Sequence, residues 1–326
     1  MAYSLTAYAT MALHADPKSL ETVPSPCTAI INLWNAIKSV KDDKIAELMS
    51  TYVDSCDGGP IEPAIELYIK HFGRVKTLHT LCKVGIIPSF RFTTDDARAD
   101  GNYALRLACA YGHLLVAQWL VERFGLTAAD ARDVDNYTLQ CACKNGHLLV
   151  AQWLVESFGL TFTDIRANNN YASRHACANG HLLVAQWLVE RFGLTAVDAR
   201  AGDNAALQLA CENGHLLVAQ WLVERFGLTV VDARSDSNAA LQRSCAKGHL
   251  LVAQCLVMRF ARTAADARTG DNAALQLACE NGHLLVAQWL VERFGLTADD
   301  ARADSNYALR YICMNGHLLV AQWLVE

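Results

Sequence analysis

The chain has 326 residues, is 52% hydrophobic and 19% charged, and carries a net charge of −5 from 28 basic and 33 acidic side chains. This composition predicts a folded protein rather than a disordered one. The absence of a basic excess removes the electrostatic basis for binding a nucleic-acid backbone, so we expect no nucleic-acid partner. No apolar stretch reaches the roughly 18 residues of a membrane span, so we also expect no membrane partner. The N-terminus lacks the basic residues of a secretory or transit signal ahead of its apolar part.

The first 95 residues precede the regular part of the chain. Residues 1–28 contain Pro17, Pro24 and Pro26 and are predicted to be an irregular segment. Residues 29–95 predict two divergent copies of the two-helix unit that fills the rest of the chain. The apolar spacing of the second helix of that unit recurs at Asp42-x-x-Ile45-Ala46-x-x-Met49 and at Gly73-Arg74-x-x-Thr77-Leu78-x-x-Leu81. Their extra charges are typical of an end cap whose outer face meets water.

Residues 96–326 consist of seven copies of a 34-residue unit without insertions. The stretch NGHLLVAQWLVE recurs unchanged at 179–190, 213–224, 281–292 and 315–326. A fixed period of this size predicts a solenoid, because each unit is too small to bury its own apolar face. Stacking the copies therefore buries the apolar face of each one against its neighbours. The Gly-His pair marks the period at His113, His147, His181, His215, His249, His283 and His317.

Each unit is expected to contain two helices, shown here for the first copy. Asn102 is the predicted N-cap of a helix that runs from 103 to about 111. A second helix follows the Gly-His pair, from about 113 to 124, and Gly125 ends it in a left-handed cap. In the connection, Thr127 and Asp130 have the spacing of a capping box, which favours a single helical turn there.

The apolar spacing assigns the buried faces of both helices. Six tryptophans occupy one position of the second helix, and we expect each to pack on the next copy rather than to form an exposed stripe. One cysteine per copy occupies a packed position of the first helix, which predicts buried, reduced thiols in an intracellular, cytoplasmic protein. The expected core of the first copy is Ala104, Leu105, Ala108, Cys109, Val116, Ala117, Leu120 and Phe124.

The motif Gly112-His113-x-x-Val116-Ala117-x-x-Leu120-Val121 resembles the ankyrin repeat, whose sequence at this place is G-H-x-x-V-V-x-x-L-L. The resemblance extends over residues 96–326 and implies an all-α, ankyrin-type solenoid of stacked helix–turn–helix repeats. It also implies a protein partner, bound in a concave groove lined by the first helices. Two departures occur: Tyr103-Ala104-Leu105-Arg106 replaces the family's T-P-L-H, and the connection lacks the family's finger motif. A short helical turn is therefore expected in place of a full β-finger.

No sequence motif for catalysis or for a cofactor is present. The chain lacks a Walker loop, a dinucleotide glycine fingerprint, a zincin motif and a nucleophile elbow. The histidines of the Gly-His pairs are a whole repeat apart, too far to share a metal ion. We therefore expect a protein that is not an enzyme and needs neither cofactor nor metal.

One aspartate and one arginine per copy recur in the connecting segments. We expect ion pairs between successive copies, forming a ladder that fixes their spacing; the alternative is independent, solvated charges. The aspartates are residues 96, 130, 164, 198, 232, 266 and 300, and the arginines are 98, 132, 166, 200, 234, 268 and 302.

A partner is expected to bind where the copies differ, because packing fixes the other positions. Tyrosine and arginine are frequent interface anchors, and they concentrate on the first helices of the first three copies. The alternative is variation without a partner. The predicted binding residues are Tyr103, Arg106, Tyr111, Tyr137, Gln140, Tyr171, Arg174 and His175.

The sequence thus favours a non-enzymatic interaction scaffold or adaptor. Two alternatives remain: an adaptor whose first 95 residues recruit other machinery such as a ubiquitin ligase, and an enzyme with an unrecognised N-terminal domain. The last copy ends on an apolar helix flank at Trp323, which predicts either a homodimer contact or an aggregation-prone edge.

The fifth copy is expected to be the weakest. Cys255 stands in place of tryptophan, and Ala261 in place of the helix-ending glycine, so the helix is expected to run on past Phe260. Met258 is expected to fold back into the space left by the missing ring. Arg262 replaces the apolar residue that follows the cap.

Overall fold

The computed structural model describes residues 65, 68–70, 72–88, 91–297, 300 and 303–325. The predicted irregular segment 1–28 and the first divergent copy lie outside these residues. The chain divides into two compact units, described separately below. Unit 1 comprises Met1–Ala142 and Leu149–Gly159, and unit 2 comprises Cys143–Leu148 and Leu160–Glu326.

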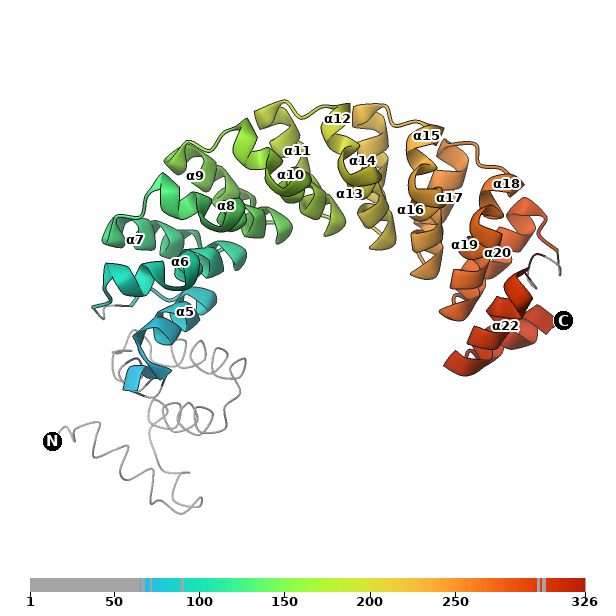
Figure 1. The fold of residues 1–326 in the computed structure, drawn as a ribbon, viewed down its shortest axis with the longest axis horizontal. Helices are drawn as coiled ribbons and strands as arrows, with labels where there is room; N and C mark the ends of the chain where they lie inside the picture. The colour runs from blue at the N-terminus through green and yellow to red at the C-terminus, as the bar shows by residue number, and fades with distance from the viewer. Residues whose placement is uncertain are drawn as a thin grey trace, which may run out of the picture. The chain divides into compact units, whose positions relative to one another are not determined.

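The described residues form helices and no strand, so the expectation of an all-α solenoid is confirmed (Figure 1). The second predicted divergent copy contributes the helix α5. The spacing of Gly73, Arg74 and Leu81 predicts a second helix there, but this prediction is wrong: α5 packs on α6 as a first helix, and Gly85 after it lies against His113 as Gly146 lies against His181. The helices of the first part are α5 (Arg74–Val84), α6 (Thr94–Ala110), α7 (Leu114–Phe124), α8 (Ala128–Lys144) and α9 (Leu148–Phe158). Those that follow are α10 (Phe162–Ala178), α11 (Leu182–Phe192), α12 (Ala196–Ala199), α13 (Ala201–Glu212), α14 (Leu216–Phe226), α15 (Val230–Ala233), α16 (Ser235–Ala246), α17 (Leu250–Arg259), α18 (Ala264–Ala267), α19 (Thr269–Glu280), α20 (Leu284–Phe294), α22 (Ala303–Asn315) and α23 (Leu318–Val325).

Two layers of helices build unit 2. The first helices of successive copies, α10, α13, α16, α19 and α22, pack closely against one another, whereas the second helices contact each other far less. Because the first helices are more closely spaced, the stack bends towards their layer. Exposed side chains of these helices therefore line the concave face of unit 2.

Single helical turns join the copies, as expected. In unit 2, α12, α15 and α18 have four residues each and lie in a row along one rim of the stack (Figure 1). Each begins at a capping box; at α15, the backbone N–H and the hydroxyl of Thr229 donate to Asp232 at 2.7 and 3.0 Å. The predicted box of Thr127 and Asp130 has the same hydrogen bonds. The connection thus takes a helical form instead of a β-finger.

The Asp–Arg ladder is confirmed within each unit. The arginine of one copy reaches the capping-box aspartate of the next with two parallel hydrogen bonds, as from Arg200 to Asp232 at 2.5 and 3.0 Å. The hydrogen bond from Arg200 lowers the pKa of Asp232 to about 2. The aspartate side chain is nearly buried, so the pair is a joint between copies rather than a solvated contact. The described rungs are Arg74–Asp96, Arg98–Asp130, Arg166–Asp198, Arg200–Asp232, Arg234–Asp266 and Arg268–Asp300.

A left-handed turn precedes each first helix, and it corrects the predicted role of the asparagine column. In the fourth copy, Gly202, Asp203 and Asn204 have φ of 62°, 58° and 64°. Asn102 has φ 57°, so it is not an N-cap, which requires extended backbone. Its side chain instead donates to Asp133 of the next copy at 3.1 Å. Asparagine suits this place because it tolerates the left-handed region better than most residues.

Most second-helix residues that face the core lie where the sequence places them. In α7, Val116, Ala117, Leu120 and Phe124 are buried. Leu115, however, is 71% exposed, and its counterparts in the other copies are exposed to a similar degree. The second helices thus carry exposed leucines at this position, outside the expected core.

The tryptophans are half-buried and contact their own helix. Trp119 meets Phe124 edge-on, with ring centroids 5.3 Å apart, and the same pair recurs in other copies. Trp221 also lines a small cavity together with Ala185 and Val189 of the preceding copy, which places it next to that copy. The rings thus contact their own copy, and Trp221 lies beside the preceding one; their packing on the following copy stays a prediction.

The cysteine column is buried in six of its seven positions, and only Cys313 is exposed. Burial raises the pKa of Cys177, Cys245 and Cys279 to about 12. A thiol with such a pKa is protonated and unreactive at neutral pH. The prediction of buried, reduced cysteines is confirmed for these six residues, and all described cysteines are free thiols.

The Gly-His pairs interlock neighbouring copies. A Cβ added to Gly248 would lie 2.5 Å from Nδ1 of His283, so the imidazole of one copy rests on the glycine of the copy before it. The ring of His283 also bonds through Nε2 to the carbonyl oxygen of Ala246 at 3.1 Å. The histidines therefore have a structural role, and the glycine is required by both close contact and its φ of 76°.

These histidines predict a loss of stability in mild acid. Burial lowers the pKa of His181, His215 and His283 below the usual value of about 6.5. As pH falls below 6.5, the unfolded chain therefore binds protons that the folded chain does not, and the free energy of unfolding decreases. We expect the urea midpoint to fall between pH 7.5 and 5.5, before the aspartates of the ladder begin to titrate. A midpoint that stays constant or rises over this range would contradict the prediction.

The fifth copy differs from the expectations in three ways. Helix α17 ends at Arg259 rather than running on, because Ala261 adopts the left-handed conformation with φ 45°. Met258 is 74% exposed and does not fill the space of the missing tryptophan ring. A cavity of about 60 Å³ remains beside Cys255. By the usual cost per unit of cavity volume, this void destabilises the copy by about 1–2 kcal/mol.

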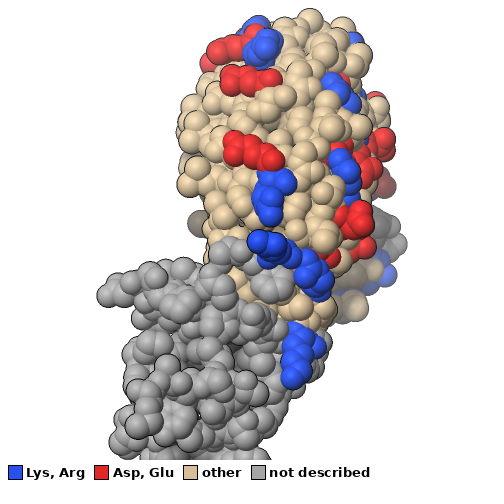
Figure 2. Space-filling view, turned by 90° about the vertical axis from the view of Figure 1, so that its left-hand side faces the viewer, with Lys and Arg blue, Asp and Glu red and all other residues tan. Residues whose placement is uncertain are grey.

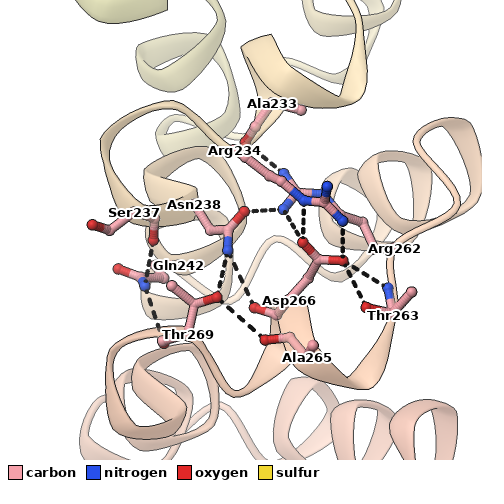
Figure 3. Close-up of polar contacts among 10 residues, drawn as sticks. All are labelled: Ala233, Arg234, Ser237, Asn238, Gln242, Arg262, Thr263, Ala265, Asp266 and Thr269. Atoms are coloured by element: carbon pink, nitrogen blue, oxygen red, sulfur yellow. Dashed lines mark hydrogen bonds and ion pairs between the residues drawn. The ribbon is translucent and has the colours of Figure 1, made fainter.

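Arg262 is 2% exposed in this copy, yet it has partners (Figure 3). Its guanidinium donates to Oδ1 of Asn238 and to the carbonyl oxygen of Ala233, and lies 3.6 Å from Asp266. Five matching asparagines, by contrast, have a buried Oδ1 without a partner: Asn102, Asn136, Asn170, Asn204 and Asn272. The arginine thus bonds to an acceptor that the leucine of the other copies leaves unpaired.

The fifth copy remains the predicted weak point of unit 2. Amide hydrogen exchange is expected to be faster in α17 than in α14, because the cavity and the strained Ala261 both lie in this copy. The stretch 256–270 is unique in the chain, so its peptides can be assigned in a mass-spectrometric measurement. Exchange in α17 as slow as in α14 would show that the bonds of Arg262 compensate for the lost packing.

Candidate functional site

A groove of about 500 Å³ lies in unit 1 between α5 and the helical part of α6 and is here called the α5–α6 groove. Both helices are first helices, and they pack closely side by side. Figure 2 shows Lys and Arg side chains gathered beside the residues drawn in grey, at the N-terminal end of the molecule. The groove is lined by Phe72, Val75, Lys76, His79, Thr80, Lys83, Asp100, Tyr103, Leu107 and Tyr111.

His79 lies in the wall of this groove, 9% exposed, and its Nε2 is buried without a hydrogen-bond partner. The ring meets Tyr103 edge-on, with centroids 4.9 Å apart. Burial lowers the pKa of His79, and the nearby charge of Arg106 lowers it as well, against the opposing effect of Asp100. The imidazole is therefore neutral at pH 7 and can accept or donate one hydrogen bond at Nε2, depending on its tautomer.

Three of the predicted binding residues come together in unit 1. The guanidinium of Arg106 lies 5.0 Å from the ring centre of Tyr103 and 5.6 Å from that of Tyr137. Tyr103 is 40% exposed, so the cluster presents an aromatic face to solvent. Val134 has φ 52° and is 51% exposed. A β-branched residue in this conformation is strained, and neither burial nor turn chemistry explains its presence.

Tyr111 is 46% exposed, and it differs from the asparagine that most later copies have at the same position. In later copies this position is an asparagine that bridges to the copy before it, as Asn213 does to the carbonyl oxygen of Ala178 at 2.7 Å. Tyr111 instead faces Lys83, whose ammonium lies 5.6 Å from the ring centre. A structural bond is thus replaced by an exposed aromatic side chain.

In unit 2, Tyr171 and His175 stack with ring centroids 3.8 Å apart, and both are half-buried. Arg174 donates from Nε and Nη2 to the carbonyl oxygens of Asn169 and Asn168, at 2.6 and 3.1 Å. The predicted residues of the third copy therefore form one local cluster on the first helix. Tyr171 and His175 present their rings beside a guanidinium that is already bound to the left-handed turn.

Gln140 is not available to a partner, in contrast to its prediction as a binding residue. It is 3% exposed and donates to the carbonyl oxygen of Asp135 at 2.7 Å. A hydrogen bond to a carbonyl oxygen of the left-handed turn is likewise donated in other copies by Arg106, Gln208, Gln242 and Gln276. The variable Arg/Gln column thus has a structural task that the sequence comparison missed: it satisfies a carbonyl group of the left-handed turn.

Among the residues that the structure describes, no group of three or more His, Cys, Asp or Glu side chains could hold a metal ion. None of the described helices is long and apolar enough to cross a membrane.

The family model for ankyrin repeats (three copies) matches residues 67–169 and 207–300, which together make up more than half of the chain. The chain belongs to the ankyrin-repeat family. Ankyrin repeats generally serve as protein–protein interaction modules. The matched segments include α5, which supports assigning it to a divergent ankyrin repeat.

Among solved structures, the X-ray structure of an ankyrin repeat family protein from Legionella pneumophila matches at 16% identity with a TM-score of 0.31. The alignment covers 98% of this chain and 85% of that chain. The search of curated proteins found no match.

Proposed function

We propose that this ankyrin-repeat protein is a non-enzymatic scaffold that binds a protein partner along the exposed face of its first helices. One observation carries the proposal: where packing leaves the first helix free to vary, the first three copies place tyrosines beside arginines. Tyr103 and Tyr111 are both at least 40% exposed, although large aromatic side chains are normally drawn into a core. The buried free thiols support an intracellular setting.

The later copies support this assignment by contrast. At the positions of Tyr171 and Arg174, three later copies have alanine and glutamine. Their glutamines keep the hydrogen bond to the left-handed turn, as Gln208 does at 2.7 Å. Neither the tyrosine nor the arginine is therefore needed for the fold, which leaves binding as the function that their side chains serve.

The test variant combines Tyr171→Ala with Arg174→Gln, which gives the third copy the residues of the fourth copy, Ala205 and Gln208. We expect the free energy of unfolding to stay the same within about 1 kcal/mol. Partner affinity should fall at least tenfold, because two anchor residues are removed. The partner is first captured from a lysate on the immobilised full chain, and its affinity is then measured by calorimetry. Leu217→Ala, on the outer side of α14, serves as the control and should leave affinity intact. Equal affinity for all three chains would reject this surface.

The predicted homodimer through the last repeat stays a prediction. Leu318 and Leu319 are 65% and 69% exposed there. Light scattering of the full chain over a concentration series would measure the association directly.

A further inference from the structure

We infer that the α5–α6 groove binds an acidic, extended segment of a partner protein, with carboxylates seated among Lys76, Lys83 and Tyr111. This inference rests on the proposed function and specifies the chemistry of its partner. It goes beyond that function by locating one end of the bound partner and giving its charge.

The charge of the groove favours an acidic ligand. Among the lining residues, Lys76 and Lys83 are cationic and Asp100 is anionic, and Arg106 lies beside Tyr103. The described lining residues are therefore net positive, in a chain whose net charge is −5. Such a local reversal of sign attracts acidic partners and speeds their association.

The two lysines are held in place by aromatic rings of the groove. The ammonium of Lys76 lies 4.7 Å from the ring centre of Phe72, and that of Lys83 lies 5.6 Å from that of Tyr111. These cation–π contacts hold two flexible side chains along the groove wall, which reduces the entropy lost when a carboxylate binds. The phenol hydroxyl of Tyr111 can donate a further hydrogen bond to the same carboxylate.

His79 adds an independent observation. Its side chain is nine-tenths buried in the groove wall, and its Nε2 has no partner. A buried polar atom without a hydrogen bond costs free energy, and a ligand that bonds to it recovers that cost. An extended peptide carries a donor and an acceptor at every residue, so its backbone suits such an atom in either tautomer.

Unit 2 shows by comparison where an acidic segment would be disfavoured. Its later first helices carry their own acids: Glu212 pairs with Arg243 at 3.3 Å, and Glu280 accepts from the hydroxyl of Tyr307 at 3.0 Å. The guanidinium and the hydroxyl are thus already bound to carboxylates of the chain, which an acidic segment would have to displace. A nucleic acid is a poorer occupant of the α5–α6 groove, because so few cations in a net acidic chain cannot neutralise a run of phosphates.

The experiment selects ligands from a random twelve-residue peptide library on the immobilised full chain. The variant Tyr111→Asn has the residue of most later copies at that position, and Lys83→Gln removes one charge. We expect the selected peptides to be enriched in Asp and Glu relative to the library. Their affinity should fall at least tenfold on the combined Tyr111→Asn, Lys83→Gln variant and rise when salt is lowered. Thermal unfolding of each variant checks that the fold is retained.

Four results would overturn the inference, and they differ in what they say of the proposed function. Neutral or basic peptides that bind through Tyr171 and Arg174 would reject the acidic segment but keep the scaffold. Acidic peptides insensitive to Tyr111→Asn and Lys83→Gln would reject the α5–α6 groove alone. A library without any selected peptide would count against both. Tighter binding of a labelled single-stranded oligonucleotide than of the selected peptides would also reject an acidic protein segment as the occupant.

Discussion

Replacing Gly248 with alanine is expected to lower the free energy of unfolding by about 3 kcal/mol. Two costs add: alanine in the left-handed region costs about 1 kcal/mol, and overpacking against a buried ring costs about 1–3 kcal/mol. The new Cβ would lie 2.5 Å from Nδ1 and 2.8 Å from Cε1 of His283, so the imidazole must move. Moving it also breaks its hydrogen bond to Ala246. Urea unfolding of the full chain measures the effect.

Gly227→Ala is the matched control. Gly227 also has positive φ, at 59°, but nothing lies within 4 Å of the Cβ position. We expect it to lose only about 1 kcal/mol, and the fifth copy already tolerates Ala261 at the equivalent place. Adding His283→Ala to Gly248→Ala should recover the steric part, with a coupling energy of about 1–3 kcal/mol. Equal losses for Gly248→Ala and Gly227→Ala would show that the histidine does not interlock the copies.

At Arg262, alanine and leucine are expected to have opposite effects. Arg262→Ala should cost about 3 kcal/mol, because it opens a cavity and leaves Asn238 and Ala233 with unpaired oxygens. Arg262→Leu fills the same space with the residue of the matching positions, all of them nearly buried. It also removes a buried charge, so we expect it to be neutral or to stabilise by about 1–3 kcal/mol.

The reason for tolerating leucine lies in the neighbouring rung of the ladder. Asp266 keeps its two hydrogen bonds from Arg234 and its capping box with Thr263 when Arg262 is removed (Figure 3). The unpaired Oδ1 of Asn238 then matches what five other copies already tolerate. Thermal unfolding of both variants decides the question: a leucine as damaging as alanine would mean that this copy requires the guanidinium.

The second helices and most of their C-terminal ends were predictable because local signals specify them. Gly125 and Leu126 form the expected cap, with the N–H of Leu126 donating to Val121 at 3.2 Å. The capping box and the Asp–Arg ladder followed from recurring residue types at fixed spacing. These features depend on residues within one copy or on its periodic neighbour, so one sequence with seven copies contains the needed information.

The left-handed turn was not predictable from the same signals. Asparagine is a common N-cap and is also at home in the left-handed region, so the residue type alone does not separate the two roles. The decisive hint was the run of Gly, Asp, Asn and Ser before each first helix, such as Gly202-Asp203-Asn204, which favours positive φ at three successive residues. Gln140 was misassigned for this reason, because its task depends on that turn.

The candidate site was only partly visible in the sequence. Tyr103, Arg106 and Tyr111 were found because they differ from their counterparts in other copies. His79 and Lys83 were missed because they belong to the divergent α5, where no sister copy marks what is unusual. Only the packing of α5 against α6 brings them beside Tyr111 in one groove.

The contacts between successive copies within a unit are alike, and this makes the copies interchangeable. Within each unit, the copies present a glycine and a ladder arginine to the copy after them, and a histidine and an aspartate to the copy before them. Removing 34 residues in frame therefore brings together two faces that already fit each other. Recombination between the near-identical second helices can lengthen or shorten the stack without redesigning any contact. The number of copies therefore sets the length of the binding surface. The variable residues of the first helices set its specificity, so the two can change independently.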